Sequence, residues 1–296
     1  MVHSTAFLTV LFVLLWNSGF IGAEYCLSYA GPFTQLFWRY LALMLILLFY
    51  LISQNRFRWP GWKTVAPTFL IGILAHAVWL SCSLLSIQYA VPAGIVALIV
   101  ALQPLTTGAL SGIVVGESTP KFRWIALGMG FSGVALPVIA RIELTDAAPL
   151  FAYFIPLGAV GAMTGATLIQ RKLEVGNRSS RLPFDLALFY QSVASALILI
   201  IPAVWVEGMA TQWHPRFLGA MAWLIFAVSL CAYVLMFELI KKTDATRVAS
   251  LFYLGPPVTM LMAWALFGDT IRIMDVVGLA IVCVSIIFVQ LQIKEK

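Results

Sequence analysis

The sequence predicts an all-α polytopic membrane protein, with ten transmembrane helices arranged as two inverted five-helix repeats. Hydrophobic residues make up 62% of the 296 residues and charged residues only 10%, whereas a soluble domain has about 25% charged residues. The apolar runs are continuous and do not alternate with polar residues, which favours helices over a transmembrane β-barrel. Several residues also recur after about half the chain length, which indicates an internal repeat.

The boundaries of the ten helices follow from the charged residues and the glycine and proline clusters that separate the apolar runs. At roughly 20 residues per crossing, a chain of this length has room for about ten helices. The first run is expected to be a helix and not a signal peptide, because no lysine or arginine precedes it. No connection is long enough for a separate soluble domain, so one integral membrane domain is expected. The expected spans are residues 4–24, 33–53, 64–87, 91–115, 121–140, 149–172, 184–206, 217–241, 245–267 and 272–293.

The distribution of lysine and arginine predicts the orientation in the membrane. With the N-terminus inside, 14 of the 18 basic residues fall in inner segments, three in outer segments and one, Arg39, within a span. Basic loops resist translocation, so both termini are expected in the cytoplasm. The expected location is the plasma membrane, which is the inner membrane in a bacterium. These loops explain the net charge of +6, and no nucleic-acid partner is expected.

The two halves of the sequence match when one is shifted along the other by 152 residues. The matched pairs are Ala93 and Ala245, Ala97 and Ala249, Pro104 and Pro256, and Gly116-Glu117 and Gly268-Asp269. We therefore predict a first repeat over residues 1–146 and a second over residues 147–296. Each repeat holds five spans, an odd number, so the second repeat enters the membrane upside down. Inverted repeats are typical of secondary transporters that work by alternating access.

Short motifs in both halves resemble those of a known family. They are Trp16-Asn17-Ser18-Gly19-Phe20, Arg39-Tyr40, the run from Pro104 to Gly116-Glu117, and the run from Pro256 to Gly268-Asp269. Over nearly its whole length the chain resembles the drug/metabolite transporter superfamily, in its ten-helix EamA-type branch. Asp269 departs from the family pattern, which usually has glutamate at that position. The resemblance implies export or exchange of small metabolites, and the group most resembled is that of the YddG-like amino-acid exporters.

Three prolines mark candidate helix breaks and gating positions. Pro104 lies near the centre of the fourth span, and Pro256 and Pro257 lie near the centre of the ninth. Proline removes a backbone donor and leaves a carbonyl one turn earlier without its partner. Breaks at matching positions of two halves are typical of a transporter binding site. The alternative is that these prolines only kink helices that pack against their neighbours.

Polar and aromatic side chains near mid-depth of the spans are candidate substrate-binding residues. Polar residues at this depth usually face the bundle interior or a wet cavity, and aromatic walls with few donors suit an amphipathic organic solute. His76 and Trp79 share a helix face. A structural hydrogen bond would equally explain His76, and plain packing would explain any one aromatic residue. The candidates are Trp16, Asn17, His76, Trp79, Gln103, Tyr233 and Tyr253.

Arg39 is a further candidate substrate-binding residue, because it is the basic residue that lies well inside a span. One role is capture of a substrate carboxylate. The alternatives are snorkelling toward the outer surface, a structural pair with Glu24, and hydrogen bonds to backbone carbonyls.

The acidic residues all lie in loops or near span ends, whereas a proton relay normally needs one at depth. We therefore expect a carrier of small amphipathic metabolites, chiefly amino acids including aromatic ones, without obligatory ion coupling. The alternative is a proton-coupled drug or metabolite exporter, because an imidazole such as that of His76 carries protons near neutral pH. An intramembrane enzyme is not expected, since the chain has neither an H-E-x-x-H nor a G-x-S-x-G motif.

Cysteine and glycine spacing bears on cofactors and assembly. No C-x-x-C pair occurs, so no metal, cofactor or disulfide is expected and the cysteines are interpreted as small buried hydrophobic residues. They are Cys26, Cys82, Cys231 and Cys283.

Glycines spaced four apart favour close helix packing, either within a monomer or between the subunits of a homodimer. They are Gly108, Gly112, Gly116, Gly161 and Gly165.

Overall fold

The computed structural model describes residues 5–116, 121–142, 148–176, 182–242 and 251–294. Within these ranges the chain is helical and has no β-strand beyond an isolated bridge between Ala30 and Thr211. The described helices form ten segments, and each corresponds to one predicted span. The predicted all-α fold of a polytopic membrane protein is therefore confirmed. Residues 245–250 of the ninth predicted span lie outside the described residues.

Six of the ten described segments are single α-helices. They are α1 (Thr5–Leu27), α2 (Pro32–Ser53), α7 (Lys121–Ile142), α8 (Leu150–Gly176), α9 (Phe184–Trp205) and α14 (Ile273–Lys294). The other four are interrupted. They are α3 (Trp62–Gly72) with the π-helix η1 (Ile73–Val78) and α4 (Trp79–Gln88); α5 (Ala93–Val100) with α6 (Gln103–Val115); α10 (Pro215–Ala222) with the π-helix η3 (Trp223–Cys231) and α11 (Ala232–Lys242); and the 3₁₀ turn η4 (Phe252–Leu254) with α13 (Gly255–Phe267).

Length and composition of the described helices fit a membrane. Seven are long and apolar enough to cross one. Shorter apolar helices lie in the fifth, ninth and tenth segments, at Trp124–Ala140, Phe252–Phe267 and Ile273–Phe288.

The interruptions recur at matching places in the two halves of the chain. The π-helices η1 and η3 lie in the middle of the third and eighth segments. Breaks before Gln103 and Gly255 divide the fourth and ninth segments. The helices that follow, α6 and α13, are capped at their C-termini by Gly116 and Gly268. The backbone of both glycines is in the left-handed conformation, with φ of +80° and +75°, which glycine adopts easily at a helix C-terminus. The boundary between the repeats at residue 146 stays a prediction, because residues 143–147 lie outside the described residues.

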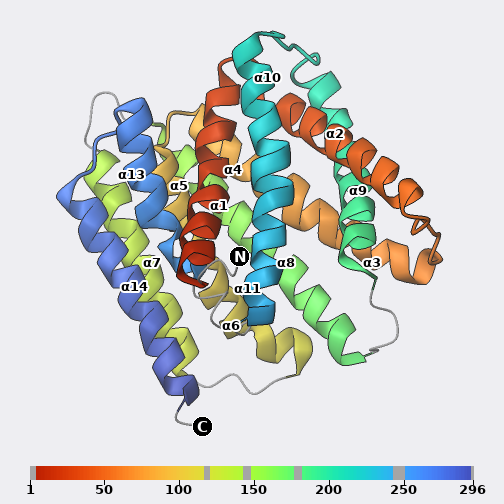
Figure 1. The fold of residues 1–296 in the computed structure, drawn as a ribbon. Helices are drawn as coiled ribbons and strands as arrows, with labels where there is room; N and C mark the ends of the chain where they lie inside the picture. Colours follow the sequence, from red (N-terminus) through yellow and green to blue (C-terminus); the bar gives the residue numbers. More distant parts are fainter. Residues whose placement is uncertain (1–4, 117–120, 143–147, 177–181, 243–250, 295–296) are drawn as a thin grey trace.

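Helices of the two halves pack against each other along their length. α2 lies against α9 and α7 lies against α14, and Figure 1 shows these two pairs on opposite sides of the bundle, with α1, α10 and α11 between them. A β-carbon added to Gly133 of α7 would lie 2.8 Å from the carbonyl oxygen of Gly278 in α14, so only glycine permits this approach. Gly161 makes no close packing contact within the monomer, because a β-carbon added there meets nothing within 4 Å.

The outer surface of the bundle is apolar. The side chains of Phe49, Ile113 and Ile273 are 78%, 75% and 80% exposed, which is unfavourable in water and suits the hydrocarbon core of a bilayer. Six exposed tryptophans lie at or near segment ends, where the amphipathic indole ring prefers the membrane interface. They are Trp59, Trp62, Trp124, Trp205, Trp213 and Trp264.

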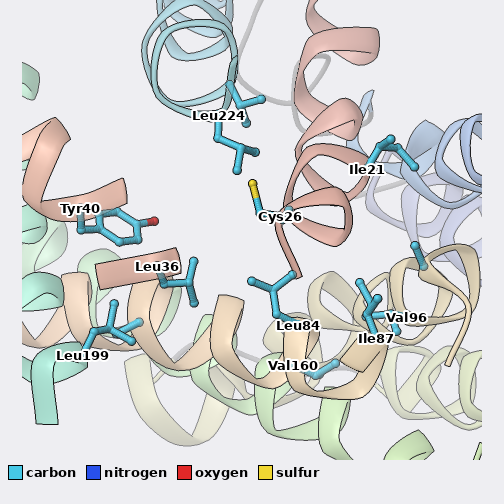
Figure 2. Close-up of a cluster of buried hydrophobic side chains, with 14 of the residues drawn as sticks. Ile21, Cys26, Leu36, Tyr40, Leu84, Ile87, Val96, Val160, Leu199 and Leu224 are labelled. Carbon is cyan, nitrogen blue, oxygen red and sulfur yellow. The ribbon is translucent and has the colours of Figure 1, made fainter. Parts of the chain in front are cut away.

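The interior between the helices is closely packed. Figure 2 shows the sulfur of Cys26 on α1 directed toward Leu224 of η3, with Leu84 of α4 below it. These three residues are buried in one hydrophobic cluster. The described cysteines are free thiols, but the prediction that all four are buried is confirmed only for Cys26, because Cys82 and Cys283 are partly exposed and Cys231 is exposed. A face turned toward lipid accepts a small apolar thiol as readily as the core does.

Candidate functional site

The bundle encloses a cavity between the two halves of the chain. Its walls come from α1, α2, η1, α4, α8, α9, η3 and α11. The space free of atoms between these walls is about 740 Å³ when the open solvent at its mouth is counted. The lining residues are Trp16, Gly19, Phe20, Ala23, Arg39, Tyr40, Leu43, Ala75, His76, Trp79, Leu80, Ser83, Leu84, Met163, Leu188, Val228, Ser229 and Tyr233.

Arg39 supplies the positive charge of this cavity. Its side chain is only 6% exposed, and its Nε and Nη2 donate to Oγ of Ser229 at 3.1 and 2.8 Å. Its Cζ also lies 5.9 Å from the centroid of the Tyr40 ring, a cation–π contact. Two alternatives from the sequence, an ion pair with Glu24 and hydrogen bonds to backbone carbonyls, are not found for Arg39 among the described residues. Three of its five N–H donors therefore have no acceptor in the part of the chain described.

Aromatic rings form much of the remaining cavity wall. Trp16 of α1 and Tyr233 of α11 meet edge to face, with centroids 5.3 Å apart. Trp79 packs against Phe20, with centroids 6.2 Å apart. The indole N–H of Trp79 is buried and has no acceptor among the described residues. Because a buried donor without a partner is unfavourable, this N–H is a candidate contact for a solute oxygen.

His76 lies in η1 and contacts the second half of the chain. Its Nε2 lies 3.0 Å from Oε1 of Gln191 in α9, within hydrogen-bond distance, and its ring centroid lies 5.3 Å from that of Tyr40. A β-carbon added to Gly72 would lie 2.6 Å from Cα of Gln191, so glycine is needed for α9 to come this close. Ser195 of α9 also donates from Oγ to the carbonyl oxygen of Gly72 at 3.1 Å. His76 thus both lines the cavity and makes a structural hydrogen bond.

The structure brings five of the eight candidate substrate-binding residues to the cavity: Trp16, Arg39, His76, Trp79 and Tyr233. The other three lie elsewhere.

Asn17, Gln103 and Tyr253 do not line the cavity. Asn17 is buried, and its Oδ1 accepts a hydrogen bond from Oγ1 of Thr259 in α13 at 3.4 Å. Nε2 of Gln103 donates to Oγ1 of Thr167 in α8 at 3.4 Å. Tyr253 belongs to η4 and packs against the hydrophobic core. Asn17 and Gln103 therefore join helices from opposite halves of the chain.

The three candidate gating prolines lie at helix starts. Pro104 is in the first turn of α6, and Pro256 and Pro257 are in the first turn of α13. A proline is well tolerated there, because the N–H that it lacks would have no partner within the helix. The three prolines therefore lie at breaks where new helices begin, and they do not kink continuous helices. None of the three lines the cavity.

Several cavity residues were not among the candidates. Phe20 and Ser83 lie one helical turn after Trp16 and Trp79, so the same spacing rule finds them. Ser229 comes from η3 in the other half of the chain. A serine within an apolar run is too common to be a signal, so only the structure reveals its contact with Arg39.

The described lining residues give the cavity the chemistry of a binding site, with one cation and no carboxylate among them. Over the described residues, no group of three histidine, cysteine, aspartate or glutamate side chains is placed to hold a metal ion. The site therefore offers a guanidinium, hydroxyl groups, an imidazole and aromatic faces to a solute.

A model of the EamA-like transporter family matches residues 3–139 and 148–291, nearly the whole chain. The chain belongs to the EamA-like transporter family. Membership of this family confirms the resemblance to the EamA-type branch and identifies the chain as a membrane transporter. The YddG-like specificity stays a prediction, as does the cytoplasmic location of both termini.

Relatives of this EamA-like chain span almost its full length. The uncharacterized transporter YvbV of Bacillus subtilis (strain 168) is 24% identical and is matched over 99% of this chain and 93% of its own. The uncharacterized inner membrane transporter YedA of Escherichia coli (strain K12) is 23% identical, over 94% and 88%. A probable amino-acid metabolite efflux pump of Salmonella typhimurium is 23% identical, over 95% and 93%. A solved crystal structure that is 15% identical has the same fold, with a TM-score of 0.65 over 99% of this chain and 98% of the other.

Proposed function

We propose that this EamA-like transporter carries small amphipathic metabolites with a carboxylate group, foremost amino acids including aromatic ones. The observation that supports this most directly is the guanidinium of Arg39. It is buried in an aromatic cavity between the two halves, and three of its donors have no acceptor among the described residues. A carboxylate matches a guanidinium in both charge and geometry.

The rest of the cavity suits the remainder of such a solute. Trp16, Trp79 and Tyr233 present aromatic surface that packs well against an apolar side chain, and the faces of such rings also attract an ammonium group. Since no carboxylate lines the cavity in the part of the chain that the structure describes, a cationic side chain would find no ion pair with these residues. Amino acids with apolar or aromatic side chains are therefore favoured over basic ones.

Alternating access is the mechanism that fits the position of the cavity. The cavity lies between two halves of similar construction, so a rocking movement of one half against the other would open it to each side in turn. The two interrupted segments that line it contain π-helices, η1 and η3, and π-helical turns occur frequently at functional sites. The lack of a carboxylate among the described lining residues supports transport without obligatory ion coupling.

The test is exchange of radiolabelled L-phenylalanine in liposomes that contain the purified protein. We expect counterflow into proteoliposomes preloaded with unlabelled L-phenylalanine, and none into protein-free liposomes. The Arg39→Gln variant should raise KM by about tenfold or more, since a charge-assisted contact contributes at least about 1.4 kcal/mol. Arg39→Lys should lie between the two, because lysine keeps the charge but loses the planar fork.

Arg58→Gln provides the matched control, because Arg58 is an exposed arginine outside the cavity. This variant should keep the KM of the unmodified protein. Failure of the unmodified protein to exchange any amino acid would contradict the proposed function. An unchanged KM in Arg39→Gln would contradict the role of the guanidinium.

A further inference from the structure

The contact between Arg39 and Ser229 joins the two halves of the transporter inside the cavity. Arg39 belongs to α2 in the first half, and Ser229 belongs to η3 in the second half. Both side chains line the cavity, and both are buried, with exposed fractions of 6% and 3%. A solute in this cavity therefore meets a hydrogen bond that joins the two halves.

The geometry of this contact resembles that of a bound carboxylate. Nε and Nη2 are the two donors along one edge of the guanidinium, and both are directed at the single Oγ of Ser229. A carboxylate takes the same edge with two oxygens, one for each donor. The hydroxyl is neutral and its one oxygen is shared, so a carboxylate is the stronger partner for Arg39.

We infer that the carboxylate of a solute replaces Ser229 on Arg39, so that solute binding breaks a hydrogen bond between the two halves. The inference rests on the proposed function and adds Ser229 as a residue that competes with the solute for Arg39. Before binding, the Ser229 hydroxyl occupies the Nε and Nη2 edge of the guanidinium. After the exchange of partners, α2 and η3 are no longer joined at this point, and the halves move past each other more easily.

This exchange of partners links binding to movement. Part of the binding free energy is used to break the contact between Arg39 and Ser229, so the carrier binds its solute less tightly than Arg39 alone would allow. In return, the loaded carrier reorients faster than the unloaded one, which is the property that an exchanger needs. Removing the hydroxyl should therefore tighten binding and reduce the advantage of the loaded carrier.

The experiment compares Ser229→Ala with Ser229→Thr, which keeps the hydroxyl, in the counterflow assay. For L-phenylalanine we expect Ser229→Ala to lower KM by at least about threefold, because one competing hydrogen bond to a charged group is lost. Ser229→Thr should keep the KM of the unmodified protein. For L-phenylalaninamide, whose neutral amide replaces the carboxylate, the KM should be the same with and without the hydroxyl. Thermal unfolding in detergent checks that each variant is folded, and Ser229→Cys, with a weak acceptor, gives a second variant.

A higher KM in Ser229→Ala, as expected for Arg39→Gln, would mean that Ser229 only holds the arginine in place, and the inference would be overturned. An equal change in KM for the acid and the amide would also overturn it. These results differ from failure of the proposed function, in which the unmodified protein exchanges neither L-phenylalanine nor any other carboxylate solute.

Discussion

His76 and Gln191 are joined by a hydrogen bond of 3.0 Å between the third segment and α9, and so between the two halves of the transporter. The other polar candidates of the first half follow the same pattern. Each has a hydrogen-bond partner in the second half, and the pairs are Asn17 with Thr259, Arg39 with Ser229, and Gln103 with Thr167. Buried polar groups in a membrane bundle need partners on neighbouring helices, and here these partners connect the two halves of the chain.

The pair His76 and Gln191 should act as a unit in transport. His76→Ala and Gln191→Leu each remove one partner and leave the other without its hydrogen bond, so each should reduce the transport rate several-fold. The double variant should be no slower than the slower single variant, with a coupling free energy of about 1 kcal/mol. Initial rates of counterflow of the four proteins measure this. Effects that simply add would show that the two residues act separately.

Cavity residues and residues that join helices should differ in what their loss changes. Trp16→Ala and Trp79→Ala remove aromatic surface from the cavity, so each should raise the KM for L-phenylalanine by about tenfold or more. Gln103→Ala removes a hydrogen bond outside the cavity and should lower thermal stability by about 1 kcal/mol while KM is unchanged. Saturation curves and unfolding curves of the three variants test this. A raised KM in Gln103→Ala would place Gln103 at the solute.

The ends of α2 and α9 are joined by contacts of different strength. The carboxylate of Glu207, in the connection after α9, accepts hydrogen bonds from the backbone N–H groups of Phe33 and Thr34 at the start of α2, at 3.1 and 2.7 Å. At the other end of this antiparallel pair, Arg56 and Asp185 form an ion pair of 2.8 Å in which the arginine is 48% exposed.

Loss of the Glu207 contact should destabilise the protein more than loss of the ion pair. Glu207→Ala removes an acceptor from a helix N-terminus and should cost about 1–2 kcal/mol. Asp185→Ala removes an ion pair whose arginine is half exposed and should cost about 0.5 kcal/mol. Thermal unfolding in detergent gives the two values. The reverse order would show that the ion pair is the stronger of the two contacts.

The transporter should equilibrate its solute and not concentrate it. Because none of the described residues that line the cavity is a carboxylate, these residues offer neither a proton nor a sodium ion an acidic site. Proteoliposomes with equal L-phenylalanine on both sides should show no net accumulation when a pH or sodium gradient is imposed. Accumulation under either gradient would rule out the uncoupled mechanism. Loss of a pH-driven accumulation in His76→Ala would then identify the imidazole as the coupling group.

The orientation of the bundle should follow the basic residues. Arg58 lies in the connection between α2 and α3, and Trp213 lies in the connection between α9 and α10, and both are exposed. On a cysteine-free background, Trp213→Cys should react with a membrane-impermeant thiol reagent added to intact cells. Arg58→Cys should react only after the membrane is permeabilised. The opposite pattern would place both termini outside.

Part of the candidate site is predictable from residue type and depth. Arg39, His76 and Trp79 are costly or unusual at mid-depth of an apolar helix, so each is visible in the sequence as a residue that needs an explanation. Residues on the same helix face as these candidates are also predictable as cavity residues. Ser83, for example, follows Trp79 by one turn and lines the same cavity. Depth does not distinguish a side chain that faces a cavity from one that faces another helix. Asn17 and Gln103 are of the second kind.

The sequence by itself determined the ten helices, because the cost of placing polar groups in hydrocarbon acts on every residue of a local run. It also determined the matching ends of α6 and α13, since a left-handed C-terminus favours glycine at Gly116 and Gly268. Only the tertiary structure decided which polar groups meet. Arg39 and Ser229 are 190 residues apart in the chain, and their contact depends on how α2 and η3 pack, which no local pattern specifies.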